Sequence, residues 1–170
     1  MLTEYKIRPI NPNEITLLEK FVYEAIFIPE GVSPPPFDII YKPELRVFFE
    51  DFGKPDDHCL VAETGGEIIG MVWTRIINGD VKGFGYVDDE TPEFGISLIK
   101  EYRGRGIGAQ LMLVMLDLLR SKGYKQTSLA VQKENYAVKM YKAVGFKIVK
   151  ELEQEYLMIC DLQKKKRIKY

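Results

Sequence analysis

The chain has 170 residues, of which 46% are hydrophobic and 29% are charged. This length favours a single domain over residues 1–170, and the composition is typical of a soluble globular protein rather than a disordered one. The 24 basic residues nearly balance the 25 acidic ones, so no strong positive field is available to hold a nucleic acid.

The ends of the chain and its cysteines exclude several further classes of protein. The N-terminal stretch MLTEYKIRPINPNE has no apolar core of the kind found in signal peptides, and the sequence has no run of about 18 apolar residues. We therefore expect no membrane contact and a cytoplasmic location. Cys59, Cys160 and the single histidine, His58, lack the spacing of metal ligands, so we expect no metal. We interpret the C-terminal KKKRIKY as a solvated end.

The first half of the chain predicts a strand, two helices and a hairpin, in that order. Apolar residues at spacings of three and four indicate the first helix, and a loop with three consecutive prolines separates it from the second. The period then changes to that of strands in CLVAET and EIIGMVWTRII, which the turn Gly65-Gly66 joins. These elements cover residues 5–8, 13–27, 44–52, 59–64 and 67–77.

The second half of the chain predicts strands that alternate with helices. An acidic loop over residues 78–92 leads to a strand, and a long amphipathic helix follows that ends at Gly123 as its C-terminal cap. The expected elements after this loop cover residues 94–99, 107–122, 127–132, 135–144, 146–149 and 156–162. Strands joined both by hairpins and by helical crossovers predict an α/β fold, with a mixed sheet of about seven strands and helices on both faces.

The stretch YRGRGIGAQL places three alternate glycines, Gly104, Gly106 and Gly108, where a strand opens into a helix. Glycine costs a helix interior about 1 kcal/mol relative to alanine, so three of them need a reason. In such a turn, backbone N–H groups converge at the positive end of the helix dipole, and glycine lets a phosphate approach the backbone. Arg103 and Arg105 add positive charge at the same place. We interpret the turn as a phosphate-binding site.

Two classes of ligand fit such a site. Gly104, Gly106 and Ala109 match the G-x-G-x-x-A fingerprint of a dinucleotide site, but that motif follows the first strand of its unit and is answered by an acidic residue about 20 positions later. Here the turn follows the fourth predicted strand, and residues 128–131 contain no acid. Read instead as R-x-x-G-x-G from Arg103, the turn resembles the pyrophosphate-binding motif of the GNAT superfamily of acyl-CoA-dependent N-acyltransferases.

A second stretch, KENYAVKMYKAVGF over residues 133–146, is similar to the later signature of the same family. That signature has an asparagine after the fifth strand, a tyrosine in a short helix and Gly-Phe at the start of the sixth strand. The resemblance covers most of the chain and is best over residues 93–146. It implies a site for coenzyme A made by Ile96, Ser97, Leu98, Arg103, Gly104, Arg105, Gly106, Ile107, Gly108, Ala109, Asn135 and Tyr141.

The resemblance also implies a role for each part of this set. The N–H groups of residues 103–109 would hold the pyrophosphate, and the backbone of residues 96–98 would pair with the pantetheine arm as an added strand does. Asn135 would contact the arm from the other side. The N–H group of Leu98 would stabilise the oxyanion that forms at the acyl carbonyl.

Two residues are expected to carry the proton transfers. By the resemblance, the phenol of Tyr141 lies near the thioester sulfur and protonates the departing thiolate. Tyrosines in helices are more often packing residues, and it is the surrounding frame NYAVKMYKAVGF that favours the catalytic role. Glu93, at the start of the fourth strand, is the candidate base for an acceptor ammonium of pKa about 10. A solvated strand-end carboxylate is an equally good interpretation of Glu93.

The sequence thus favours an enzyme, an N-acetyltransferase that moves an acetyl group from acetyl-CoA directly to a primary amine. The expected acceptor is a small molecule or a peptide, with a different acyl-CoA donor or a hydroxyl acceptor as alternatives. A homodimer would agree with the family. The competing hypothesis is a binding module that keeps the coenzyme groove as a sensor or assembly element and has lost turnover. A nicotinamide or flavin oxidoreductase is a third class.

Overall fold

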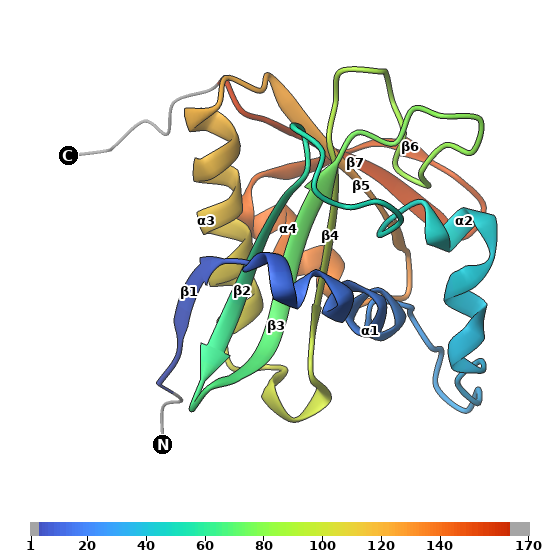
Figure 1. Ribbon diagram of the computed structural model, residues 1–170. Coiled ribbons are helices and arrows are strands. Elements are labelled where there is room, and N and C mark those ends of the chain that lie inside the picture. Colours follow the sequence, from blue (N-terminus) through green and yellow to red (C-terminus); the bar gives the residue numbers. More distant parts are fainter. Residues whose placement is uncertain (1–3, 164–170) are drawn as a thin grey trace.

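Seven strands form one sheet in the computed structural model, which describes residues 4–163. Their order across the sheet is β1-β2-β3-β4-β5-β7-β6 (Figure 1). The strands are β1 Lys6–Pro9, β2 His58–Thr64, β3 Glu67–Arg75, β4 Glu93–Leu98, β5 Gln126–Gln132, β6 Phe146–Glu151 and β7 Glu155–Asp161. The helices are α1 Leu18–Glu24, α2 Pro43–Arg46, α3 Ile107–Ser121 and α4 Ala137–Val144, with the 3-10 turns η1 Pro12–Leu17, η2 Phe37–Tyr41 and η3 Lys100–Tyr102.

Neighbouring strands are antiparallel except β4 and β5, which run parallel because the crossover between them passes through α3. Helix α1 crosses one face of the sheet, and α3 and α4 lie on the other (Figure 1). The prediction of a mixed sheet with helices on both faces is therefore confirmed. Within residues 4–163, none of the helices has the length and apolar character needed to cross a bilayer. The predicted solvated tail lies outside the described residues.

Two clusters of buried side chains fill the two sides of the sheet. On the α3 side, Ile107, Leu111 and Met115 are each at most 1% exposed and recur at intervals of four, so one stripe of the helix packs on the strands. On the α1 side, Phe21 belongs to the same buried cluster as Trp73 of β3. Burying a side chain of this size contributes about 1.5–3 kcal/mol, so each cluster holds its helix against the sheet.

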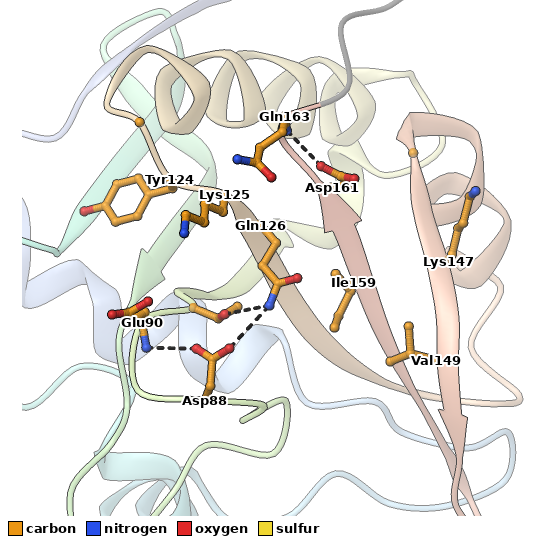
Figure 2. A pocket seen from close by; sticks show the side chains of 13 residues that line it. Asp88, Glu90, Tyr124, Lys125, Gln126, Lys147, Val149, Ile159, Asp161 and Gln163 are labelled. Carbon is orange, nitrogen blue, oxygen red and sulfur yellow. Dashed lines mark hydrogen bonds between the residues drawn. The ribbon is translucent and has the colours of Figure 1, made fainter.

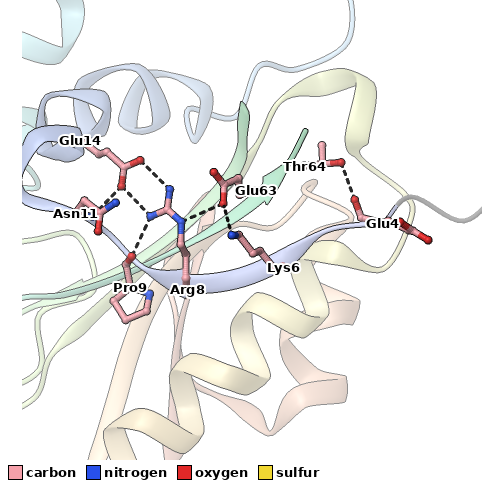
Figure 3. Close-up of polar contacts among 8 residues, drawn as sticks. All are labelled: Glu4, Lys6, Arg8, Pro9, Asn11, Glu14, Glu63 and Thr64. Carbon is pink, nitrogen blue, oxygen red and sulfur yellow. Dashed lines mark hydrogen bonds and ion pairs between the residues drawn. The ribbon is translucent and has the colours of Figure 1, made fainter. Parts of the chain in front are cut away.

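The predicted helix over residues 13–27 is divided in the structure, since its first part is the 3-10 turn η1 and only α1 is α-helical. The guanidinium of Arg8 ties η1 to the first two strands (Figure 3). It donates to both carboxylate oxygens of Glu14, each at 2.8 Å, and to Glu63 of β2 at 3.2 Å. The hydrogen bonds from Arg8 are the main reason that the pKa of Glu14 falls to about 2.

The predicted helix over residues 44–52 is α-helical only over α2. The buried guanidinium of Arg75, at the end of β3, donates to the carbonyls of Val47 and Glu50 at 3.0 and 2.8 Å. A continuing helix would use these carbonyls for its own N–H groups. The chain turns away instead, and Arg75 completes its contacts with both oxygens of Asp57 at 3.1 and 2.9 Å.

Replacing Arg75 by methionine tests how much this buried pair contributes. The side chain of Asp57 is 3% exposed and would lose its charged partner inside the protein. We expect the free energy of unfolding, measured by urea denaturation, to fall by about 3–5 kcal/mol. Arg46→Met is the control, because its ion pair with Glu50 is about half exposed, 48% and 49%, and such pairs contribute at most about 1 kcal/mol. Equal losses in the two variants would contradict this view of Arg75.

Candidate functional site

The glycine turn between β4 and α3 owes its shape to two left-handed residues. Gly104 and Gly106 have φ angles of 75° and 83°. This region costs an ordinary L-residue about 1–2 kcal/mol. Gly108 differs, because it lies in α3 and a methyl group there would meet Leu98 and Met140 at an ordinary 3.5 Å. The backbone therefore favours glycine at the first two positions and merely permits it at the third.

The N–H groups at the start of α3 are available to an anion. The first bond into the helix runs from the N–H of Gln110 to the carbonyl of Gly106 at 3.2 Å, so the N–H groups of residues 107–109 precede the helical ladder. They lie at the positive end of a 15-residue helix. The N–H of Arg103 is instead taken by the carbonyl of Lys100 at 3.2 Å, so the set of available donors begins after Arg103.

Both arginines of the turn are engaged with the protein. The guanidinium of Arg103 donates to the carbonyl of Leu98 at 3.1 Å and to the carboxylate of Glu24 at 3.3 Å. The guanidinium of Arg105 lies over the ring of Tyr102 at 5.3 Å. Arg103 therefore ties the turn to β4 and α1, which differs from the expectation that its charge meets a phosphate.

Strands β4 and β5 separate directly after their first contact. Among the described residues, the ladder between them consists of one pair, Glu93 opposite Ser128. The N–H of Ser128 donates to the carbonyl of Pro92 at 3.1 Å at the same point. From there the strands diverge toward the glycine turn, and the two backbone edges that face this gap have no strand between them. Such an edge can pair with an extended chain.

The alternation of hydrogen bonds along β4 decides which residues face the gap. The N–H of Ile99 donates to the carbonyl of Ile69 at 2.9 Å, and bonded pairs alternate with non-bonded pairs in an antiparallel ladder. The backbones of Ile96 and Leu98 therefore face the gap, whereas that of Ser97 bonds to β3. The buried hydroxyl of Ser97 donates to a carbonyl of α1 at 2.6 Å, so this residue fixes α1 on β4.

Tyr141 lies on the α4 side of the sheet, close to β4. Its ring packs on Phe146 with centroids 6.1 Å apart, and Phe146 packs on Phe94 of β4 at 5.7 Å. Burial raises the pKa of Tyr141 to about 12, with a smaller contribution from Tyr136, so the phenol keeps its proton at neutral pH. Asn135 accepts a backbone N–H of the first turn of α4 at 2.9 Å through its side-chain oxygen, and so shapes the start of that helix.

Glu93 is buried rather than solvated. The residue is 4% exposed, its Oε1 accepts the N–H of Gly85 at 2.5 Å, and its Oε2 has no hydrogen-bond partner among residues 4–163. Burial raises its pKa to about 7; the bond from Gly85 opposes the rise and the charge of Glu155 adds to it. A carboxyl that titrates near neutrality can exchange a proton with a substrate. The interpretation of Glu93 as a solvated strand end is wrong.

The surroundings of Glu93 were not expected from the sequence. Gly83 and Gly85 of the β3–β4 loop close over the carboxyl. Trp73 lies on the same face of the sheet, and its indole N–H is also buried without a partner in the described part of the chain. The sequence signal that could have indicated this close approach was the pair of glycines on either side of one phenylalanine in the acidic loop. Because unpartnered buried polar atoms are rare in native proteins, Glu93 and Trp73 indicate a place that a ligand or water completes.

Other polar groups lie away from this site. Cys59 and Cys160 are buried, and burial raises the pKa of both thiols. The Nε2 atom of His58 lies 3.1 Å from the hydroxyl of Tyr124. No group of His, Cys, Asp and Glu side chains within residues 4–163 could hold a metal ion. A hollow of about 670 Å³ opens at the N-terminal end of β5, and none of the predicted site residues lines it (Figure 2).

The chain is similar to known acetyltransferases. Residues 25–146 match the model of the Acetyltransferase (GNAT) family. Mycothiol acetyltransferase from Corynebacterium aurimucosum is 38% identical over 68 residues, which cover 37% of this chain and 22% of that protein. An N-alpha-acetyltransferase from Sulfurisphaera tokodaii is 28% identical over 113 residues, 64% of this chain and 68% of that one. The chain spans less than half the length of most of the curated relatives it matches.

Solved structures of the same fold cover nearly the whole chain. PaiA N-acetyltransferase from Thermoplasma acidophilum, in complex with coenzyme A, has a TM-score of 0.67 at 20% identity and covers 94% of this chain and 99% of its own. The ribosomal-protein-S18-alanine N-acetyltransferase from Escherichia coli has a TM-score of 0.66 at 13% identity, over 98% and 100%. With the fold shared and the family matched over residues 25–146, the resemblance is confirmed, and the chain belongs to the GNAT family of acetyltransferases.

Proposed function

We propose that this protein transfers an acetyl group from acetyl-CoA to a primary amine of a small molecule or a peptide. The observation that carries the proposal is the separation of β4 from β5 above the glycine turn. It leaves donors and acceptors of β4 to an extended ligand, and an anion site stands at the mouth of the gap. Coenzyme A combines an extended arm with a pyrophosphate and so matches both features.

Three groups of residues would hold the coenzyme. The N–H groups of residues 104–109 bind the pyrophosphate at the start of α3. The backbones of Ile96 and Leu98 pair with the arm, and Asn135 contacts it from the α4 side. Leu98 lies at the mouth of the gap, beside the turn, whereas the thioester lies at the inner end of the arm. The N–H of Ile96 is therefore a better oxyanion donor than that of Leu98.

In the proposed reaction Glu93 acts as the base and Tyr141 assists the departing sulfur. Glu93 takes a proton from the acceptor ammonium, directly or through a water, and the freed nitrogen attacks the thioester carbonyl. The N–H of Ile96 stabilises the negative oxygen until the carbon–sulfur bond breaks. The nitrogen then gives up its second proton, which passes through water to the departing thiolate, so the products are the N-acetyl amine and free coenzyme A thiol. A phenol of pKa about 12 is a weaker acid than a thiol of pKa about 8.5, so Tyr141 acts mainly by a hydrogen bond to the departing sulfur.

Calorimetric titration with acetyl-CoA tests the glycine turn. Gly106→Ala puts a side chain into a left-handed conformation that costs about 1–2 kcal/mol. The free turn of the variant relaxes to avoid this cost and must return to the left-handed conformation to bind, so the affinity should fall about tenfold. Gly123→Ala is the matched control, because it introduces the same left-handed strain (φ 84°) just after the far end of α3, outside the proposed site, and its affinity should equal that of the wild type. Equal losses in both variants, or a wild type that does not bind acetyl-CoA, would make the proposed coenzyme site wrong.

Glu93→Gln tests the base at nearly constant size. With a pKa of about 7, Glu93 is ionised above that pH, so kcat/KM of the wild type should rise with pH up to about 7 and then level off. The variant should lose this rise and about 100-fold or more of kcat/KM. Exposed Glu153→Gln is the control and should keep both. A pH rise that persists in Glu93→Gln would assign the base to another group.

Tyr141→Phe removes the phenolic hydroxyl and keeps the ring packing on Phe146. We expect kcat to fall about 100-fold, as when one hydrogen-bond donor to a developing negative charge is removed, with little change in the affinity for acetyl-CoA. Tyr5→Phe is the control, since Tyr5 precedes β1 at the edge of the sheet and should not affect the rate. Release of free thiol with a panel of amines measures the reaction. An unchanged rate would leave Tyr141 as a packing residue, and binding without any turnover would favour a coenzyme-binding module.

A further inference from the structure

Two glycines of the β3–β4 loop lie against the carboxyl of Glu93. A Cβ atom on Gly83 would overlap its Oε2, and one on Gly85 would lie 2.9 Å from its Oε1. Neither glycine has a positive φ, so the backbone conformation does not call for glycine at either position. The close approach of the loop to the carboxyl of Glu93 is what requires glycine at both positions.

Gly85 joins this loop to both strands at the point where they separate. Its N–H donates to Glu93 of β4 at 2.5 Å, and its carbonyl accepts the hydroxyl of Ser128 of β5 at 2.6 Å. The loop backbone therefore lies across the inner end of the gap, over the carboxyl that the proposed reaction uses.

Phe84 stands between the two glycines and is turned outward. The residue is 52% exposed, and its ring stacks on that of Phe48 with centroids 6.0 Å apart and an angle of 22°. A half-exposed ring of this kind can leave its partner without opening the core on either side of the sheet. It is suited to hold a loop segment reversibly.

We propose that Gly83-Phe84-Gly85 is a flap that closes over Glu93, is latched by the stack of Phe84 on Phe48, and must lift before the acceptor amine reaches the carboxylate. The inference rests on the proposed function, because that function makes Glu93 the base that takes the proton of the acceptor ammonium. With the flap closed, Oε2 is buried and Oε1 is occupied by Gly85, so neither oxygen is open to an amine. Lifting the flap opens both oxygens at the inner end of the gap.

Hydrogen exchange of the Gly85 amide reports the flap directly, because this N–H is the donor to Glu93. Gly83→Ala puts a methyl group against Oε2 and keeps the flap from closing, so the amide should lose its protection. Gly79→Ala is the matched control in the same loop, where a Cβ meets nothing within 4 Å, and protection should remain. If Gly83→Ala leaves Gly85 protected, the flap does not close on the carboxyl and the proposal is overturned.

Phe84→Ala tests the latch and the gating together. Without the stack on Phe48, a larger share of molecules is open. The exchange rate of the Gly85 amide and kcat/KM for the amine should therefore rise several-fold by the same factor, while the KM for acetyl-CoA stays the same. Val81→Ala, which removes another partly exposed apolar side chain of the loop, should change none of these. Faster exchange with an unchanged or lower kcat/KM would overturn the gating.

The experiments distinguish an error in the flap proposal from an error in the proposed function, because hydrogen exchange is measured without acetyl-CoA. If the wild type acetylates no amine in a panel, the proposed function is wrong, and the gating falls with it whatever the exchange shows. If acetylation proceeds but Phe84→Ala leaves both the exchange of Gly85 and kcat/KM unchanged, only the flap is wrong.

Discussion

The divergence of β4 and β5 after the single pair of Glu93 and Ser128 is the constraint on which the rest of the structure depends. Inside a sheet, a strand normally satisfies its backbone groups on both sides, and beyond this pair β4 does so only toward β3. The features of the proposed site lie along the gap that this divergence leaves between β4 and β5. The glycine turn stands at its open end, α4 supplies Tyr141 from one face of the sheet, and the β3–β4 loop covers its closed end on the other.

The order of strands and helices and the glycine turn could be predicted from the sequence, because they depend on local chemistry. Periods of two and of three to four, and glycines in left-handed turns, are legible over a few residues. The contacts of individual charged side chains could not be predicted. Arg103 bonds to Glu24, 79 positions away, and Arg75 ends the second helix from 25 and 28 positions away. The burial of Glu93 depends on a loop whose path no local pattern indicates.

Strand alternation places the proposed base and the proposed hydrogen-bond donor to the sulfur on opposite sides of the sheet. Successive side chains of β4 point to opposite faces, so Glu93 lies on the α1 side and Phe94 on the side where Phe146 and Tyr141 pack. In the proposed reaction, an acceptor would lose its proton on one face while the sulfur departs on the other. Separate approaches for the two reactants follow from the pleat of one strand.

Arg75 stands directly opposite Glu93 in the β3–β4 ladder, and the two share a face. A guanidinium that reached across would compensate the carboxylate and depress its affinity for protons. Asp57 and two carbonyls of the chain after α2 hold this cation instead, so the carboxylate keeps its hydrophobic surroundings without a counter-ion. Asp57 and these two carbonyls, by holding Arg75, thereby help to keep the pKa of Glu93 above its usual value. A change at Asp57, which touches no reactant in the proposed reaction, would alter the chemistry by releasing a positive charge toward the base.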